Sequence, residues 1–283
     1  MSAIPDPPAR PTVIYDLGSN NGDDIPYYLL KADKVVAVEA NPRLAAHIAQ
    51  RFADEIAAGR VVVENCALTD DPNVGEVTFY IYDQQDGRSA LHPAADELAD
   101  FTPITVAAAN IVDIVRRYGE PYYIKIDLEG FDHAVLKDLF LNGIFPPYIS
   151  AEAHVVEVFC TLVSLGGYRA FKMIRSQSFE DLYARCTVET RTGPAEMRFS
   201  LMHNSGPFGN DIGGAWLDPV VFQRYLAHVG LGWNDIHASR LDAPSPDRVG
   251  MRSQLAAELL FQAGMRLKSR RILRWSRQLW GAA

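Results

Sequence analysis

Two acidic residues and a loop with two glycines follow apolar runs near the start of the chain. A run that contains Asp16 leads into a loop with Gly18 and Gly22, and the next run ends in Glu39. At the edge of a parallel sheet, glycines let a ligand approach the backbone, and an acid closing the second strand can accept hydrogen bonds from both ribose hydroxyls. The spacing Asp-x-Gly-x-x-x-Gly differs from the Gly-x-Gly-x-x-Gly pattern of dinucleotide sites. It suits a ligand that carries an ammonium and a sulfonium group, so we predict a site for S-adenosylmethionine.

A second group of ionisable residues lies in residues 124–130, a segment with the character of a central strand. Lys125, Asp127 and Glu129 alternate along it and therefore share one side of an extended chain. Charged side chains are rarely buried without partners, so the pattern favours a binding or catalytic site at the end of the strand. We expect Asp127 to lie near the reactive end of the donor. Lys125 could equally be half of a structural ion pair.

Glu152 and His154 close the next predicted strand and again share one face. Histidine is the usual general base near neutral pH, and a hydroxyl acceptor must lose its proton as it attacks the methyl carbon. His154 or Asp127 is the candidate base, with Glu152 as an orienting partner. Two structural alternatives stay open: a histidine hydrogen-bonded at a strand end, and an ion pair that involves Glu152.

Two further segments complete the predicted site. Asn65, Cys66 and Ala67 follow the third predicted strand, where an adenine ring would lie. A simple strand-end turn is an equally good interpretation for any one of them. Arg88 and Ser89 belong to a polar, turn-rich segment that we expect to form part of a lid over the acceptor. No metal site is predicted, because the histidines and the three cysteines lack the spacing of metal ligands.

Short apolar runs alternate with amphipathic segments, which is typical of an α/β fold with a doubly wound, mostly parallel sheet. A strand at 75–82 is expected to be half of a hairpin insertion, and 197–203 is expected to be the last strand of the sheet. After residue 203 the sequence becomes turn-rich and then helical. We therefore expect two parts, 1–203 and 204–283, the second being a C-terminal helical extension. The seven strands of the sheet are expected at 12–17, 34–39, 60–64, 122–127, 148–153, 168–174 and 197–203.

The charge distribution limits the classes of partner. The net charge is −8 over 283 residues, but the segment after residue 247 carries +7 and the rest −15. An acidic body is a poor partner for nucleic acid, whose phosphates require clustered Lys and Arg. The basic tail could contact an anionic membrane, pack on the acidic body or form a dimer contact, and we favour the last two. Without a long apolar run or signal peptide, we expect no membrane span and a cytoplasmic location.

Four segments resemble the FkbM family of S-adenosylmethionine-dependent methyltransferases: YDLGSNNGDD at 15–24, VAVEANP at 36–42, NCALTD at 65–70 and IKIDLEG at 124–130. The resemblance covers roughly residues 12–175. It implies a class I methyltransferase (Rossmann-like) fold and O-methylation, commonly of sugars, polyketides or other natural products. By position, it implies that the amino-acid end of the donor is held by Asp16, Gly18, Asn20 and Gly22, the ribose by Glu39, and the adenine by Asn65, Cys66 and Ala67. Asp127 and Glu129 would face the methyl group and the acceptor, and the same loops add Ser19, Ala40 and Asn41 to the predicted donor site.

We therefore expect an enzyme that transfers a methyl group to a hydroxyl of a glycan or a natural-product small molecule, chiefly by in-line positioning. The alternative is a non-catalytic partner subunit that docks through its basic C-terminal helix. The presence of Asp16, Glu39 and Asp127 counts against that alternative.

Overall fold

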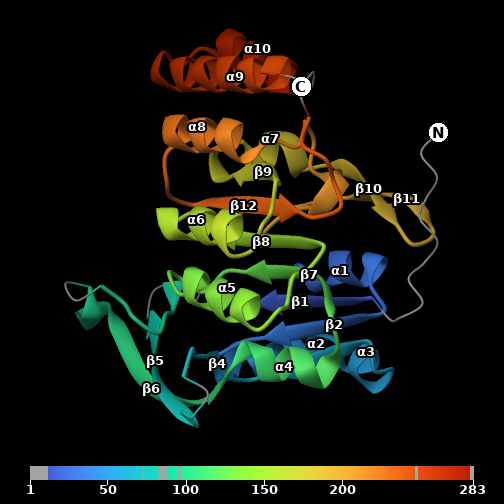
Figure 1. Ribbon diagram of the computed structural model, residues 1–283, viewed down its shortest axis with the longest axis vertical. Helices are drawn as coiled ribbons and strands as arrows, with labels where there is room; N and C mark the ends of the chain where they lie inside the picture. Colours follow the sequence, from blue (N-terminus) through green and yellow to red (C-terminus); the bar gives the residue numbers. More distant parts are fainter. Residues whose placement is uncertain (1–11, 72, 83–87, 95–96, 246–247, 281–283) are drawn as a thin grey trace.

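A computed structural model describes residues 12–71, 73–82, 88–94, 97–245 and 248–280 (Figure 1). Its centre is a seven-stranded sheet with the order β3-β2-β1-β7-β8-β12-β9. The neighbours from β3 to β8 pair in parallel, whereas β12 runs antiparallel to both β8 and β9. This confirms the predicted α/β class and the mostly parallel sheet. In sheet order, the strands are β3 (Val61–Glu64), β2 (Lys34–Val38), β1 (Val13–Leu17), β7 (Pro121–Ile126), β8 (Tyr148–Glu152), β12 (Asn234–Ser239) and β9 (Ala170–Arg175).

Helices cover both faces of the sheet, which is why its central strands are mostly apolar, with Asp16, Lys125 and Glu152 as ionisable exceptions. In β1, Tyr15 and Leu17 enter one core and Ile14 enters the other, because successive side chains point to opposite faces. The first core is closed by α4 (Ile111–Tyr118), α5 (Asp132–Leu141), α6 (Val156–Ser164) and α8 (Pro219–Val229). The second is closed by α1 (Ile25–Lys31), α2 (Pro42–Arg51) and α7 (Phe179–Tyr183), and the short α3 (Ala53–Ala57) follows α2.

A small second sheet projects from the main one beside α5 (Figure 1). It has the order β4-β6-β5 and consists of β4 (Ala67–Leu68), β5 (Glu76–Tyr82) and β6 (Phe101–Ala109). The antiparallel pairing of β5 with β6 confirms the hairpin predicted around 75–82. Phe79, Ala67 and Val106 form its own small core. This hairpin therefore brings apolar side chains to the side of the main sheet where β2 and β3 end.

The prediction of 197–203 as the last strand of the sheet is wrong. Instead, β11 (Gly193–Met197) pairs with β10 (Cys186–Thr190) in a separate hairpin, and β12 completes the sheet. The sequence of β12, NDIHAS, contains no apolar run, and its polar residues Asn234, His237 and Ser239 are buried. The part of the chain after residue 203 thus supplies a strand from the interior of the sheet, and the sheet does not end at residue 203.

Two C-terminal helices, α9 (Arg248–Arg266) and α10 (Arg270–Trp280), stack beyond α8 at the end of the molecule (Figure 1). An ion pair between Arg175 of β9 and Glu258 of α9 is buried on both sides. The extension therefore packs on the body of its own chain. Among the described residues, none of the helices combines the length and apolar character that a membrane crossing requires.

Candidate active site

A cavity opens where β1, β2 and β7 end. Its place is the switch point of the sheet, since β2 and β3 lie on one side of β1 and β7 lies on the other. Open α/β sheets bind ligands at such points. The cavity walls include nine of the residues predicted from the sequence: Gly18, Asn20, Glu39, Ala40, Cys66, Ala67, Ser89, Asp127 and Glu129.

The loop after β1 passes so close to β7 that only glycine fits at its first turn. Gly18 has a φ of +79°, and a Cβ placed there would lie 1.9 Å from the carbonyl oxygen of Asp127. The Asp127 amide in turn donates to the carbonyl of Leu17 at 3.0 Å. The ends of β1 and β7 are therefore in direct contact at the floor of the cavity, where a ligand can approach the backbone of Gly18 closely.

Glu39 holds the loops on either side of the cavity. One carboxylate oxygen accepts from the amide of Asn20 and the other from the amide of Asn41, both at 2.8 Å. The side chain is buried, and this burial raises the pKa of Glu39 to about 7. Each oxygen can accept one more hydrogen bond, and Glu39 lines the cavity. The carboxylate is thus a preformed acceptor for a pair of hydroxyl groups.

Lys125 joins the two acids predicted at the reactive end. Its ammonium donates to the Gly18 carbonyl at 2.9 Å and lies 3.2 Å from Asp127 and 3.5 Å from Asp16. Burial opposes the charged form of Lys125, but the nearby carboxylates prevail and raise its pKa well above the ordinary value. Asp16 does not line the cavity: it is buried behind Lys125, and burial raises its pKa. Asp127 is the member of this group that reaches the cavity.

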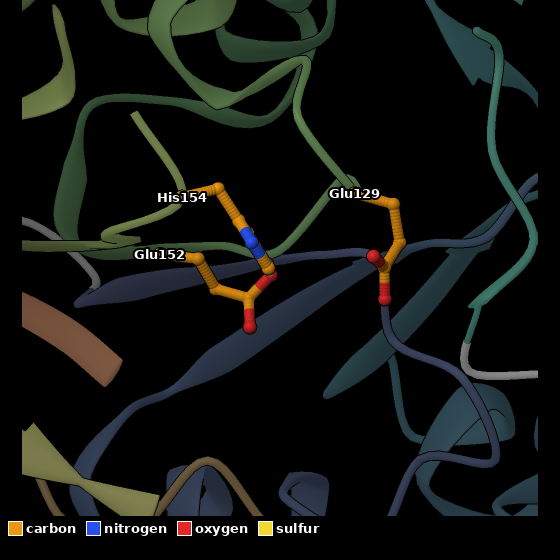
Figure 2. A group of neighbouring side chains, drawn as sticks. All are labelled: Glu129, Glu152 and His154. Atoms are coloured by element: carbon orange, nitrogen blue, oxygen red, sulfur yellow. The ribbon is translucent and has the colours of Figure 1, made fainter. Parts of the chain in front are cut away.

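Glu129, Glu152 and His154 meet at the ends of β7 and β8 (Figure 2). His154 Nε2 lies 2.9 Å from Glu152 Oε2, and Glu129 faces them from the neighbouring loop. Burial, together with the charges of Asp127 and Asp132, raises the pKa of Glu129 to about 8. Burial and the surrounding carboxylates raise the pKa of Glu152 well above its usual range. The sequence predicted a shared face for Glu152 and His154 and another for Lys125, Asp127 and Glu129, and the structure brings Glu129, Glu152 and His154 together in a compact polar cluster beside the cavity.

The other predicted residues act on the loops around the cavity and do not line it. The Asn65 amide donates to the carbonyls of Glu39 and Ala40 at 2.8 and 3.3 Å. Ser19 donates to the Asp16 carbonyl at 2.7 Å, and Asn41 caps α2 by accepting from the Arg43 amide at 3.0 Å. Gly22 has a φ of +79°, which suits its turn. In the predicted lid, Arg88 is exposed and pairs with Glu97 at 2.6 Å, while 83–87 and 95–96 lie outside the described residues.

Several site residues were not predicted from the sequence. The apolar wall of the cavity includes Leu44, Phe79 and Leu91, which come from α2, β5 and the segment after β5. Asp132 is buried and accepts from the amides of Leu128 and Glu152 at 3.3 and 3.2 Å, so it joins the two loops of the polar cluster. Its position at the start of α5 is the signal that could have drawn attention to it, but acids are common there for helix stability alone.

Comparisons with known proteins place the chain in a family. Residues 16–175 match the family model described as Methyltransferase FkbM domain, which is more than half of the chain. The chain belongs to the FkbM methyltransferase family. No curated protein sequence matches the chain.

Solved structures are similar to this methyltransferase at low identity. One is the methyltransferase FkbM from Methylobacillus flagellatus KT, at 16% identity and a TM-score of 0.39 over 57% of this chain and 39% of that one. This protein therefore spans about two fifths of that structure. A precorrin-6y C5,15-methyltransferase from Geobacter metallireducens GS-15 aligns at 10% identity and a TM-score of 0.34 over 80% and 79% of the chains. A spermidine synthase in complex with the transition state analogue AdoDATO aligns at 10% identity and a TM-score of 0.37 over 86% and 57%.

Proposed function

We propose that this protein transfers the methyl group of S-adenosylmethionine to a hydroxyl of a glycan or a natural-product small molecule. The proposal depends on one observation above all. A single cavity carries Glu39 on one wall and Asp127 and Glu129 on another, with Glu152 and His154 beside it. A nucleoside and an acceptor can therefore be held end to end in one site.

The chain's own residues fit the donor. Glu39 has free acceptor positions for two ribose hydroxyls, and Leu44, Phe79 and Leu91 offer an apolar surface for an adenine ring. Asp127, beside Lys125, presents a carboxylate for the charged end of the donor. Asp16 would act through Lys125, whose position it helps to fix.

The donor supplies an electrophilic methyl group, so the enzyme has to align the acceptor oxygen and remove its proton. His154 and Asp127 are the two groups that could take this proton. Replacing His154 with Ala should lower turnover while donor affinity stays the same. An unchanged turnover would remove His154 as the base.

The test has two parts. Calorimetry should detect S-adenosylhomocysteine binding, which should weaken in Glu39→Gln and persist in Glu64→Gln. Glu64 ends the neighbouring strand β3, pairs with Arg117 and does not line the cavity, so it is a matched control. Methyl-labelled donor should then be incubated with a panel of polyols, glycans and amines, and the product examined by NMR. A methyl group on nitrogen or carbon would contradict O-methylation, and failure to bind S-adenosylhomocysteine would favour a non-catalytic scaffold.

A further inference from the structure

The cluster of Glu129, Glu152 and His154 has the composition of a metal site. Each residue offers one donor atom, and the three atoms lie within 4.8 Å of one another. Glu152 is the last residue of β8, and Glu129 lies in the loop after β7, so adjacent parallel strands position them. Donors around an octahedral ion at about 2.1 Å are separated by about 3.0 Å when adjacent and about 4.2 Å when opposite. Two donor atoms at the 4.8 Å limit would therefore approach by about 0.6 Å to take opposite positions, or by about 1.8 Å to take adjacent ones.

Within the described part of the chain, no Lys or Arg forms an ion pair with the carboxylates of this cluster, although Arg88 and Lys125 act on Glu129 from farther away. Glu152 has only 5% of its side chain exposed, and one of its oxygens pairs with His154. In the described ranges, the other oxygen has no hydrogen bond or ion pair, and neither has the carboxylate of Glu129. Lys125 does not neutralise them, since its ammonium pairs with Asp16 and Asp127. Buried negative charge without a partner is costly, and a cation between these groups would remove that cost.

The surrounding acids increase the negative charge at this position. Asp132 accepts from the backbone amide of Glu152, and Asp235 on β12 is the direct register partner of Glu152. Neither belongs to the set of donors that converge. Coordination is therefore assigned to the three converging residues, and Asp132 and Asp235 lie outside the ligand set.

We propose that Glu129, Glu152 and His154 hold a divalent cation of the Mn²⁺ or Mg²⁺ class, and that this ion binds the acceptor through two adjacent oxygen atoms. Carboxylate oxygens favour Mg²⁺ and Mn²⁺, and a single imidazole among them shifts the preference toward Mn²⁺. Three protein ligands leave up to three octahedral positions, enough for a vicinal diol or a hydroxy-carbonyl group and one water.

This inference rests on the proposed function and refines its acceptor class. Glu129 lies both in the ion site and in the cavity wall with Asp127, so a chelated hydroxyl would stand next to the donor. Coordination lowers the pKa of that hydroxyl. Its O–H bond breaks with the proton passing to Asp127, the oxygen forms the new O–C bond, and the C–S bond of the donor breaks with its electron pair remaining on sulfur. His154 then serves as a ligand, and Asp127 is the base.

Mn²⁺ binding to the full-length protein, first stripped of metal by a chelator, tests the site directly. Electron paramagnetic resonance titration should show one bound Mn²⁺ per chain, with pulsed spectra showing coupling to an imidazole nitrogen. Glu152→Gln and His154→Ala should each weaken Mn²⁺ binding at least ten-fold, and His154→Ala should abolish the nitrogen coupling. Asp235→Asn, the matched acidic control, should change Mn²⁺ affinity less than three-fold. A vicinal diol added in excess should alter the spectrum, whereas a monohydric alcohol should not.

The result that overturns the site is a chain that binds S-adenosylhomocysteine normally but no stoichiometric Mn²⁺. An equal loss of affinity in Asp235→Asn would also overturn it, since that result indicates a diffuse acidic attraction. Both outcomes leave the proposed methyl transfer standing, since that proposal is tested separately by donor binding and by the atom that receives the methyl group. If Glu152→Gln does not fold, the nitrogen coupling in the wild-type chain and the affinity of Glu129→Gln decide the question.

Discussion

Replacing Glu39 with Gln tests the donor site most directly. Each oxygen of Glu39 accepts one backbone amide at 2.8 Å and keeps one acceptor position toward the cavity. Glutamine has one carbonyl oxygen, and its NH₂ group cannot accept a hydrogen bond. One hydrogen bond between a ribose hydroxyl and a charged acceptor is therefore lost. Such a bond contributes about 1.5–3 kcal/mol, which corresponds to an affinity loss of about 10- to 150-fold.

Calorimetry with S-adenosylhomocysteine measures this loss, and an analogue without ribose hydroxyls identifies its source. The wild-type chain should bind that analogue more weakly than S-adenosylhomocysteine, whereas Glu39→Gln should discriminate much less between the two. Because the amide of Asn20 or Asn41 also loses its acceptor, the variant should lose about 1–3 kcal/mol of unfolding free energy. A change in affinity below three-fold, with Glu64→Gln behaving the same, would refute the placement of the ribose at Glu39.

Three further outcomes are expected from the geometry. Gly18→Ala should abolish donor binding and lower the unfolding free energy by at least about 2 kcal/mol in urea denaturation. The reason is that Gly18 has a φ of +79° and the new Cβ would meet the carbonyl of Asp127. Near-normal donor binding in this variant would contradict the close approach of the two strand ends. The folded-state pKa of Glu39, about 7, exceeds its unfolded value, so the folded chain holds an extra proton between about pH 4.5 and 7. This group should therefore reduce the unfolding free energy by up to about 3 kcal/mol as pH rises through that range. Urea titrations at pH 5 and pH 8 should show a smaller difference in unfolding free energy in Glu39→Gln than in wild type, and an equal difference in the two proteins would show that the burial does not act as described. Arg175→Met should lower the unfolding free energy by about 3–5 kcal/mol, because it leaves Glu258 buried without its partner. Adding Glu258→Leu to this variant should recover most of the lost stability. A double variant as unstable as the single one in urea denaturation would refute the role of the ion pair.

The strands that carry the site could be predicted because their sequences are apolar on both faces. β1, β2 and β7 are buried almost throughout, and their runs end in the acids that the structure brings to one edge. β12 could not be predicted in the same way. It is an interior strand between β8 and β9, and the burial of its polar residues Asn234 and His237 depends on tertiary structure.

The acidic residues of the site could also be predicted from local sequence patterns, whereas the residues of its apolar wall could not. Strand-end residues such as Glu39, Asp127 and Glu129 have local signatures, since the period of a strand fixes which side chains share a face. Leu44 and Phe79 look like ordinary core residues in the sequence. They reach the cavity only because α2 and the β5–β6 hairpin fold against the edge of the sheet.

The late position of β12 in the chain has a consequence for biosynthesis. β9 has β12 as its sheet neighbour, so on the ribosome residues 170–175 emerge long before residues 234–239 can pair with them. During that interval β8 and β9 both present open edges, which invite pairing with other nascent chains. The segment that matches the family model, 16–175, thus lacks the strand that pairs with both β8 and β9. A stalled or prematurely terminated chain should depend on chaperones until its seventh strand is synthesised.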